Sequence, residues 1–143
     1  MTKIFLIILL LPFSLLAQKR NDNQIILSTP DSASIVYRNM FQYLMQHDYE
    51  VINKDDKNYQ ITASKIAESP GAADMKVNIK VLRTDSTRAF ITGSYQGGKG
   101  ANSVGKDIVY FASPNTLAGK MWTNMAQLVE VHPNSKIKYN RKK

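Results

Sequence analysis

The chain contains no cysteine among its 143 residues. Disulfides, cysteine-ligated zinc, iron–sulfur clusters, thiol chemistry and a lipid anchor on cysteine are therefore excluded, and the fold must be held together by packing alone. Histidine is almost as scarce, with only His47 and His132. A metal site usually needs three or four ligands, and neither histidine has Asp or Glu at a ligand spacing, so we expect no metal. Each histidine follows a predicted helix, where the negative end of the dipole favours it.

A long hydrophobic run is also missing. The apolar stretch 4–17 has 14 residues, and Pro12 interrupts it. A helix that spans a membrane needs about 20 apolar residues. Because Lys3 precedes the stretch and Ala17 ends it, residues 1–17 have the three parts of a secretory signal peptide. We therefore expect export, with the mature protein in the periplasm or cell envelope and the extracellular space as the alternative.

Two features favour an uncleaved signal anchor instead. Leu15 is larger than the small residue usual three positions before a cleavage site, and Lys19 and Arg20 add positive charge on the side that must be translocated. Whether the signal is removed after Ala17 or retained as an anchor is therefore left open.

Negative charge is absent from the C-terminal twelve residues, although the chain has a formal net charge of +8. The basic residues of this segment are Lys136, Lys138, Arg141, Lys142 and Lys143. We predict a folded domain over 18–131 and a basic, flexible tail over 132–143. Such a tail could contact anionic lipid or lipopolysaccharide, or be a solvated end that aids solubility. Because the domain itself is nearly neutral and exported, neither nucleic acid nor nucleotide is expected as a partner.

The body of the chain predicts a strand, a helix, a series of hairpins and a last helix. An apolar run predicts a strand at 24–28, and Thr29-Pro30-Asp31 has the chemistry of a helix start. The first helix has one apolar face with three- and four-residue steps. Its members are Ala33, Val36, Tyr37, Met40, Tyr43, Leu44 and His47.

Alternating apolar and polar residues then predict antiparallel strands. Strands are expected at 49–52, 59–64, 75–81 and 88–95, and the brief apolar run 108–111 is either a further strand or a loop insertion. Ser113-Pro114-Asn115 is expected to open the last helix. Its apolar face is formed by Ala118, Met121, Trp122, Met125, Leu128 and Val129. The predicted fold is α+β with two layers, in the order β-α-β-β-β-β-α. An antiparallel sheet of four to six strands would have both helices on one face.

This element order, with the strand 90–95, a glycine-rich loop and the helix segment Met121-Trp122-Thr123-Asn124-Met125, resembles a group of small exported bacterial domains of uncharacterised function. The resemblance covers about residues 24–131. It implies a TATA-binding-protein-like or BamC-like fold and a location in the cell envelope, and it implies no active site.

Three segments were tested as sites. The stretch 100–106 has the glycine and lysine spacing of a P-loop, but Asp107 replaces the required hydroxyl and a strand follows, so we predict a hairpin loop and no cofactor. Asp55 and Asp56 are expected in a solvated turn. Trp122, with Met121 and Met125, could line a ligand pocket between helix and sheet, although this spacing is more typical of core.

From these observations we expect a non-catalytic exported envelope protein, a binding or interaction module with an envelope protein, anionic lipid or lipopolysaccharide as partner. The alternative is a small-molecule or lipid carrier with a pocket near Trp122, and a hydrolase with unrecognised acids is the third hypothesis.

Overall fold

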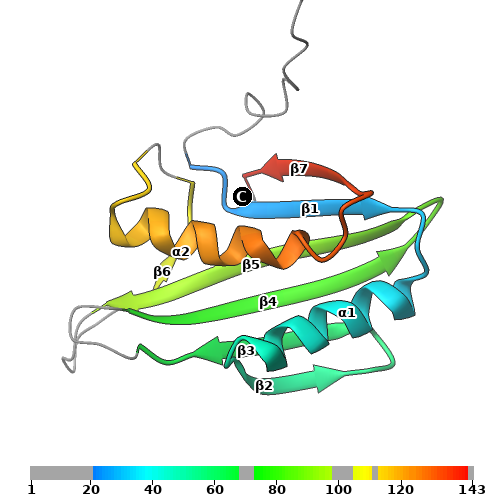
Figure 1. Ribbon diagram of the computed structural model, residues 1–143, viewed down its shortest axis with the longest axis horizontal. Helices are drawn as coiled ribbons and strands as arrows, with labels where there is room; N and C mark the ends of the chain where they lie inside the picture. Colours follow the sequence, from blue (N-terminus) through cyan, green and yellow to red (C-terminus); the bar gives the residue numbers. More distant parts are fainter. Residues whose placement is uncertain (1–20, 68–72, 98–104, 111–112, 142–143) are drawn as a thin grey trace, which may run out of the picture.

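Two long strands, β4 (Ala73–Arg83) and β5 (Thr87–Gly97), form the centre of the sheet in the computed structural model (Figure 1). The structure describes residues 21–67, 73–97, 105–110 and 113–141, so the predicted signal peptide lies outside the described residues. The other elements are β1 (Gln24–Thr29), α1 (Ala33–Gln46), β2 (Glu50–Asp55), β3 (Gln60–Lys65), β6 (Lys106–Asp107), α2 (Leu117–Ala126), the 3-10 turn η2 (Gln127–Val129) and β7 (Lys136–Asn140).

Strict alternation along β4 separates the two faces of the sheet. Met75, Val77, Ile79 and Val81 are buried, whereas the residues between them are exposed. β4 pairs with β5 in an unbroken antiparallel register that runs from Ala73 opposite Gly97 to Arg83 opposite Thr87. Because successive side chains point to opposite faces, this register aligns the apolar positions of both strands on one side.

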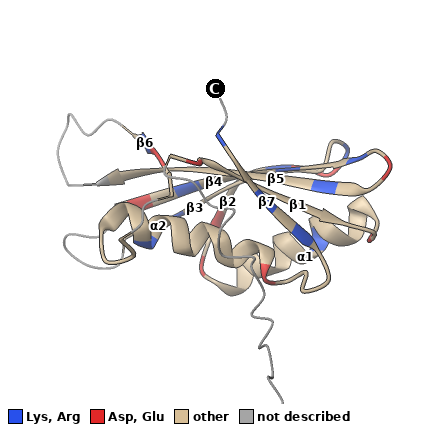
Figure 2. Ribbon diagram, turned by 90° about the horizontal axis from the view of Figure 1, so that it is seen from above, with Lys and Arg blue, Asp and Glu red and all other residues tan. Residues whose placement is uncertain are grey.

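The remaining strands extend the sheet in the order β2-β3-β4-β5-β1-β7, with β6 paired to the end of β5, and every pairing is antiparallel. Both helices lie on the same face of this seven-stranded sheet, and the other face is bare of helices (Figure 2). The predicted two-layer α+β fold is confirmed. The sheet has one strand more than the upper limit predicted, because β7 joins it.

The apolar stripes of the helices cover the buried face of the sheet as predicted, except that His47 is exposed at the C-cap of α1. α1 buries Ala33, Val36, Tyr37, Met40 and Leu44, and packs on β2 to β5. α2 buries Met121, Trp122 and Met125 and packs on β4 and β5, while Leu128 and Val129 of η2 complete the core. Within the described part of the chain, neither helix is long and apolar enough to cross a membrane.

Both helices begin later than the sequence predicts, and the predicted caps Thr29 and Ser113 are wrong. The N-cap of α1 is Ser32, whose Oγ accepts the N–H of Ile35, and that of α2 is Thr116. Thr29 ends β1, and its Oγ1 accepts the N–H of Asp31 instead. The proline of each segment lies in the turn that leads to the helix, and a second hydroxyl after it supplies the cap.

Gly93 permits the closest approach between α2 and the sheet. A Cβ atom at this position would lie 2.7 Å from Cδ1 of Ile108 and 3.1 Å from Sδ of Met125. Both of those side chains are fully buried. The glycine in the centre of β5 therefore fits a packing requirement, since any side chain here would push the helix and the segment after β6 away from the strand.

The C-terminal segment continues the sheet beyond the end of the predicted domain. β7 pairs with β1 from Lys136 opposite Ser28 to Asn140 opposite Gln24. Tyr139 shares the covered face with Ile25, and its ring lies 5.8 Å from that of Trp122. The sequence suggested a tail because lysines alternate here with only two apolar residues. That alternation is what an edge strand with one covered face shows.

We expect Gly93→Ala to lower the free energy of unfolding by about 1–3 kcal/mol, because the added methyl group overpacks a fully buried site. Gly105→Ala is the matched control, since a Cβ there meets nothing within 4 Å. Urea unfolding of both variants measures the difference. Equal stability of the two variants would contradict the close packing at Gly93.

Removal of residues 136–143 should lower the free energy of unfolding by more than about 2 kcal/mol, because it strips β1 of a paired neighbour and Trp122 of Tyr139. Removal of 141–143 alone, which leaves β7 intact, should have no effect. Thermal and urea unfolding compare the two truncations, and equal stability would show that β7 contributes nothing to the fold.

Candidate functional site

The face of the sheet opposite the helices, here called the open face, presents a continuous row of uncharged polar side chains. Each of six neighbouring strands contributes one residue, and each of these residues stands directly opposite the next. In the order β2, β3, β4, β5, β1 and β7 they are Asn53, Thr62, Asn78, Thr92, Gln24 and Asn140. We call this set the neutral row. A β-bulge between Val51 and Asn53 brings the β2 member into line. Every strand of the main sheet path thus contributes one amide or hydroxyl group.

Most hydrogen-bonding groups of the neutral row point to solvent rather than to one another. Among the described residues, the single side-chain hydrogen bond within the row runs from Oγ1 of Thr62 to Oδ1 of Asn78, at 3.0 Å. An amide side chain has two donor hydrogens and an acceptor oxygen, and a hydroxyl can donate and accept. The row therefore offers both donors and acceptors to an external molecule.

A second row beside the neutral row combines positive charge with apolar surface. It has one residue on each of five strands, and each residue stands opposite the next. In the order β3, β4, β5, β1 and β7 they are Gln60, Lys80, Phe90, Ile26 and Lys138. We call this set the lysine row. Phe90 and Ile26 are half-buried, and the lysines on either side are exposed. Leu82, which is 41% exposed, adds apolar surface near Phe90.

A shallow depression of about 360 Å³ lies where the two rows meet. Its walls come from β1 to β5 and include Gln24, Asn53, Gln60, Thr62, Asn78, Lys80, Leu82, Phe90 and Thr92. Small-molecule sites typically measure about 300–1,000 Å³ and combine apolar surface with a few convergent polar groups. The depression has this composition and lies at the lower end of that size range.

Charge is unevenly distributed over the open face. Arg88 and Lys136 lie in the row beyond the lysine row, so positive charges gather on this side of the neutral row. Glu50, Asp74 and Asp107 lie on the other side of the neutral row, together with Lys76. The depression thus lies between a positive region and a mainly negative one.

The residues predicted to contact an anionic surface are divided by the structure. Lys136 and Lys138 belong to β7 and point to the open face, where they are exposed. Arg141 follows the strand and is exposed as well. Lys142 and Lys143 lie outside the described residues. Two of the five predicted residues are therefore held at fixed positions on the open face, on the edge strand β7 and outside the lining of the depression.

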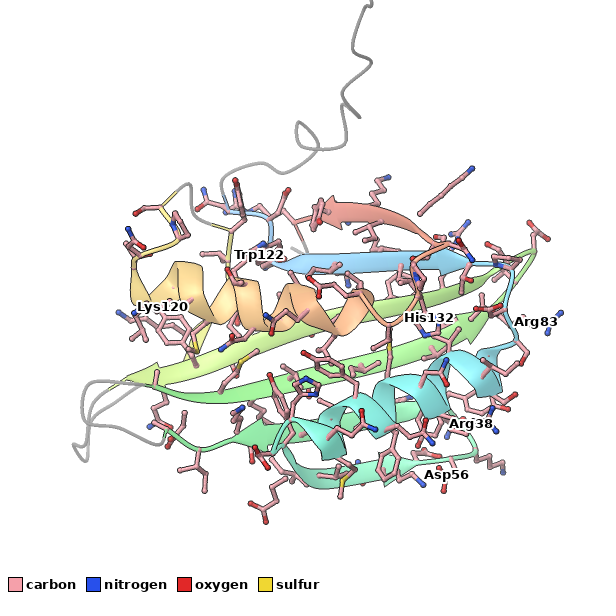
Figure 3. The ribbon with its side chains drawn as sticks, in the orientation of Figure 1. Arg38, Asp56, Arg83, Lys120, Trp122 and His132 are labelled. Atoms are coloured by element: carbon pink, nitrogen blue, oxygen red, sulfur yellow. The ribbon has the colours of Figure 1, made fainter. Side chains whose placement is uncertain are left out.

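The predicted ligand pocket around Trp122 is packed with other side chains. Trp122 (Figure 3) is only 4% exposed, and its ring lies 5.7 Å from that of Tyr110, in addition to its contact with Tyr139. Met121 and Met125 are buried beside it. The depression described above is lined by none of these three residues. Their closest contacts are those of a hydrophobic core.

The two histidines occupy different environments. His47 is exposed, stacks on Tyr43 with ring centroids 3.8 Å apart, and its Nδ1 lies 2.9 Å from the carbonyl oxygen of that residue. His132 is 5% exposed, and its Nδ1 lies 3.5 Å from Oδ2 of Asp31 (Figure 3). In the described part of the chain, no group of three or more acids and histidines could hold a metal ion.

The acid pair Asp55 and Asp56 is engaged in the turn between β2 and β3. Asp55 accepts the backbone N–H groups of Lys57 and Asn58, each at 3.0 Å, and the side-chain amide of Asn58 at 2.7 Å. The hydrogen bonds from Asn58 and Lys57 lower the pKa of Asp55. This carboxylate therefore organises the turn, as its place in an Asn/Asp-rich segment suggests.

Asp56 links the same turn to α1. The carboxylate of Asp56 (Figure 3) pairs with Nζ of Lys54 at 2.8 Å and accepts a hydrogen bond from the hydroxyl of Tyr37 at 2.9 Å. Both contacts lower the pKa of Asp56, and the contact with Lys54 has the larger effect. Burial, followed by the bond to Asp56, raises the pKa of Tyr37. The ring of Tyr37 also packs against Tyr59, which has a strained φ of 51°.

The P-loop-like stretch falls largely on 98–104, outside the described residues. Lys106, which ends the stretch, and Asp107 form the short strand β6, just before the segment 108–111. Ile108 comes next and is fully buried against Gly93. A strand and a core residue thus stand where a phosphate-binding loop would be followed by a helix.

The sequence did not identify the neutral row, because Asn53 was expected in a turn and Asn140 in the flexible tail. Thr62 and Asn78 were predicted to face solvent, which is correct. Their alignment with Gln24 and Asn140 depends on the pairing of β1 with both β5 and β7, which the sequence alone did not specify.

A comparison with protein-family models finds no family that matches the chain. A comparison with curated proteins likewise finds no significant match.

We expect Asp56→Asn to destabilise the protein more at neutral than at acidic pH. Since the folded-state pKa of Asp56 is lowered, its carboxylate stabilises the fold above its unfolded pKa of about 4, and this contribution is lost as the pH falls through the folded pKa. Urea unfolding at several pH values between about 6 and about 2 should show a shrinking difference between the native protein and the variant. A difference that stays constant or grows on acidification would refute the role of this carboxylate.

Proposed function

We propose that the chain is a non-catalytic binding protein of the cell envelope and that it binds its partner on the open face of the sheet. The observation that carries this proposal is the depression between the neutral row and the lysine row, where amide, hydroxyl, ammonium and apolar groups converge on one surface. The secretory signal peptide expected at residues 1–17 supports the envelope as the compartment.

The titratable groups that could serve a hydrolase have structural roles instead. Asp55 and Asp56 hold a turn, His47 stacks on Tyr43, and His132 is buried at the C-terminal end of η2. An acid–base catalyst must reach the proton that it transfers, typically from within a cleft. Asp55 and Asp56 share one turn, whereas His47 and His132 lie in other parts of the fold, and none of the four lines the depression.

The open face also suits binding better than the buried layer does. A carrier would need a cavity among the apolar side chains around Trp122, whereas those side chains pack on Tyr110 and Tyr139. A molecule can reach the neutral row without any rearrangement of the core, because the row lies on the face of the sheet that no helix covers. This favours recognition of a partner at the surface over enclosure of a ligand.

The proposal is tested by cosedimentation of the purified protein with isolated cell envelopes. We expect Asn78→Trp, which fills the depression, to reduce the bound fraction at least about tenfold, since a misplaced side chain removes complementarity across the site. Met45→Trp is the matched control, because Met45 lies on the helical layer and is 55% exposed. Equal binding by both variants, or hydrolysis of envelope material by the native protein, would overturn the proposal.

A further inference from the structure

We propose that the partner of the open face is an acidic polysaccharide, with its hydroxyl groups bound by the neutral row and its carboxylates by Lys80 and Lys138. This inference rests on the proposed function and specifies the chemistry of its ligand. It is argued from the hydrogen-bonding capacity of the neutral row, the apolar surface at Phe90, and the sign and position of the charges beside them.

The neutral row matches the hydroxyl groups of a sugar chain in both capacity and spacing. Each sugar hydroxyl donates and accepts a hydrogen bond, as do the amide and hydroxyl side chains of the row. Neighbouring strands lie about 4.8 Å apart, so the row repeats its polar groups at about the length of one monosaccharide. A chain that crosses the strands could therefore meet a new polar side chain with each successive sugar.

Phe90 provides the apolar contact that a sugar ring requires. One face of a pyranose ring carries mainly C–H groups, and these pack well on an aromatic side chain. Phe90 lies between Lys80 and Ile26 in the lysine row and lines the depression together with Leu82. A ring placed over Phe90 would have its edge next to Thr92 and Asn78, which are the central members of the neutral row.

The charges favour an acidic sugar over a neutral one. Lys80 and Lys138 stand on either side of the Phe90–Ile26 pair, three strand steps apart, which corresponds to roughly 14 Å. Arg88 and Lys136 add positive charge in the next row. Asp55 stands opposite Gln60, at the end of the lysine row farthest from Lys138, and its carboxylate accepts the side-chain amide of Asn58. Carboxylates spaced along a chain would complement this region.

Nucleic acids and membranes fit the face less well. Proteins that bind single strands stack successive bases on several aromatic side chains, and among the described residues of the open face Phe90 is the single aromatic one. A lipid surface would need apolar side chains that insert, whereas the centre of this face consists of amides and hydroxyls. These two classes of partner become outcomes of the test.

The experiment measures the affinity of the purified full chain for polygalacturonate by isothermal titration at low and moderate salt. The comparison probes are fully methyl-esterified polygalacturonate, polyglutamate, a single-stranded DNA oligonucleotide and phosphatidylglycerol vesicles. We expect the strongest binding to polygalacturonate, with the methyl ester at least about tenfold weaker because its carboxyl groups are uncharged. Polyglutamate, DNA or vesicles bound as tightly as polygalacturonate would overturn the inference.

Variants of similar size identify the side chains that bind polygalacturonate. Asn78→Leu and Thr92→Val should each weaken binding by about three- to tenfold, as expected for the loss of one or two hydrogen bonds. Lys80→Met should weaken binding by a similar factor and reduce its salt dependence. Lys76→Met is the matched control, because it removes the same charge from the same face of β4. Lys76 lies four residues from Lys80, in the row of Glu50 and Asp107, so its loss should change the affinity less than twofold. Equal losses for Lys76→Met and Lys80→Met would indicate unspecific charge attraction and overturn the inference.

The two proposals fail in different ways. If native protein binds cell envelopes through the depression but does not bind polygalacturonate, the ligand class is wrong and the binding function stands. If Asn78→Trp also leaves envelope binding unchanged, both proposals fall. Folding of each variant is checked by its urea-unfolding midpoint, and because these positions are solvent-facing we expect changes within about 0.5 kcal/mol of native stability.

Discussion

The pairing of β4 with β5 sets the character of both faces of this protein. The register is unbroken over eleven residue pairs, and from Met75 to Val81 buried apolar and exposed polar side chains alternate, so one face can be covered by helices while the other is mainly polar. A slip of one residue would exchange the two faces of a strand. The buried core and the neutral row are therefore two consequences of the same register, and neither can change without the other.

The position of the helices depends on this register as well. Gly93 lies on the covered face and lets Met125 and Ile108 approach the backbone of β5, while Thr92, its neighbour, lies in the centre of the neutral row. At the C-terminal end, Tyr139 anchors β7 against Trp122, and the adjacent residues Lys138 and Asn140 then point to the open face. Core packing thus fixes where the polar and charged groups of the candidate site stand.

The sequence predicted the local elements well because each has a period of its own. The alternation in 75–81 and the apolar stripe of α1 describe single elements, and these matched the structure apart from the helix starts. The helix starts were missed because Thr29 and Ser113 are as good cap residues as Ser32 and Thr116, and only the direction of the preceding turn decides between them. The strand β7 was missed because an edge strand with one partner carries a weak apolar signal, and here five basic residues outweighed Ile137 and Tyr139.

The candidate site could not be predicted for a different reason. Its residues come from six strands, and they converge only through pairings between segments far apart in the chain.

The central claim is that the aligned amides and hydroxyls of the open face form the binding surface. It is tested most directly by the NMR signals of the Asn and Gln side-chain NH₂ groups as purified envelope polysaccharide is added to the protein. The account predicts that the largest shifts occur at Gln24, Asn53 and Asn78, with small changes at Asn39, Gln42 and Gln46 on the helical layer. Shifts concentrated on the helical layer, with the open-face amides unchanged, would contradict it.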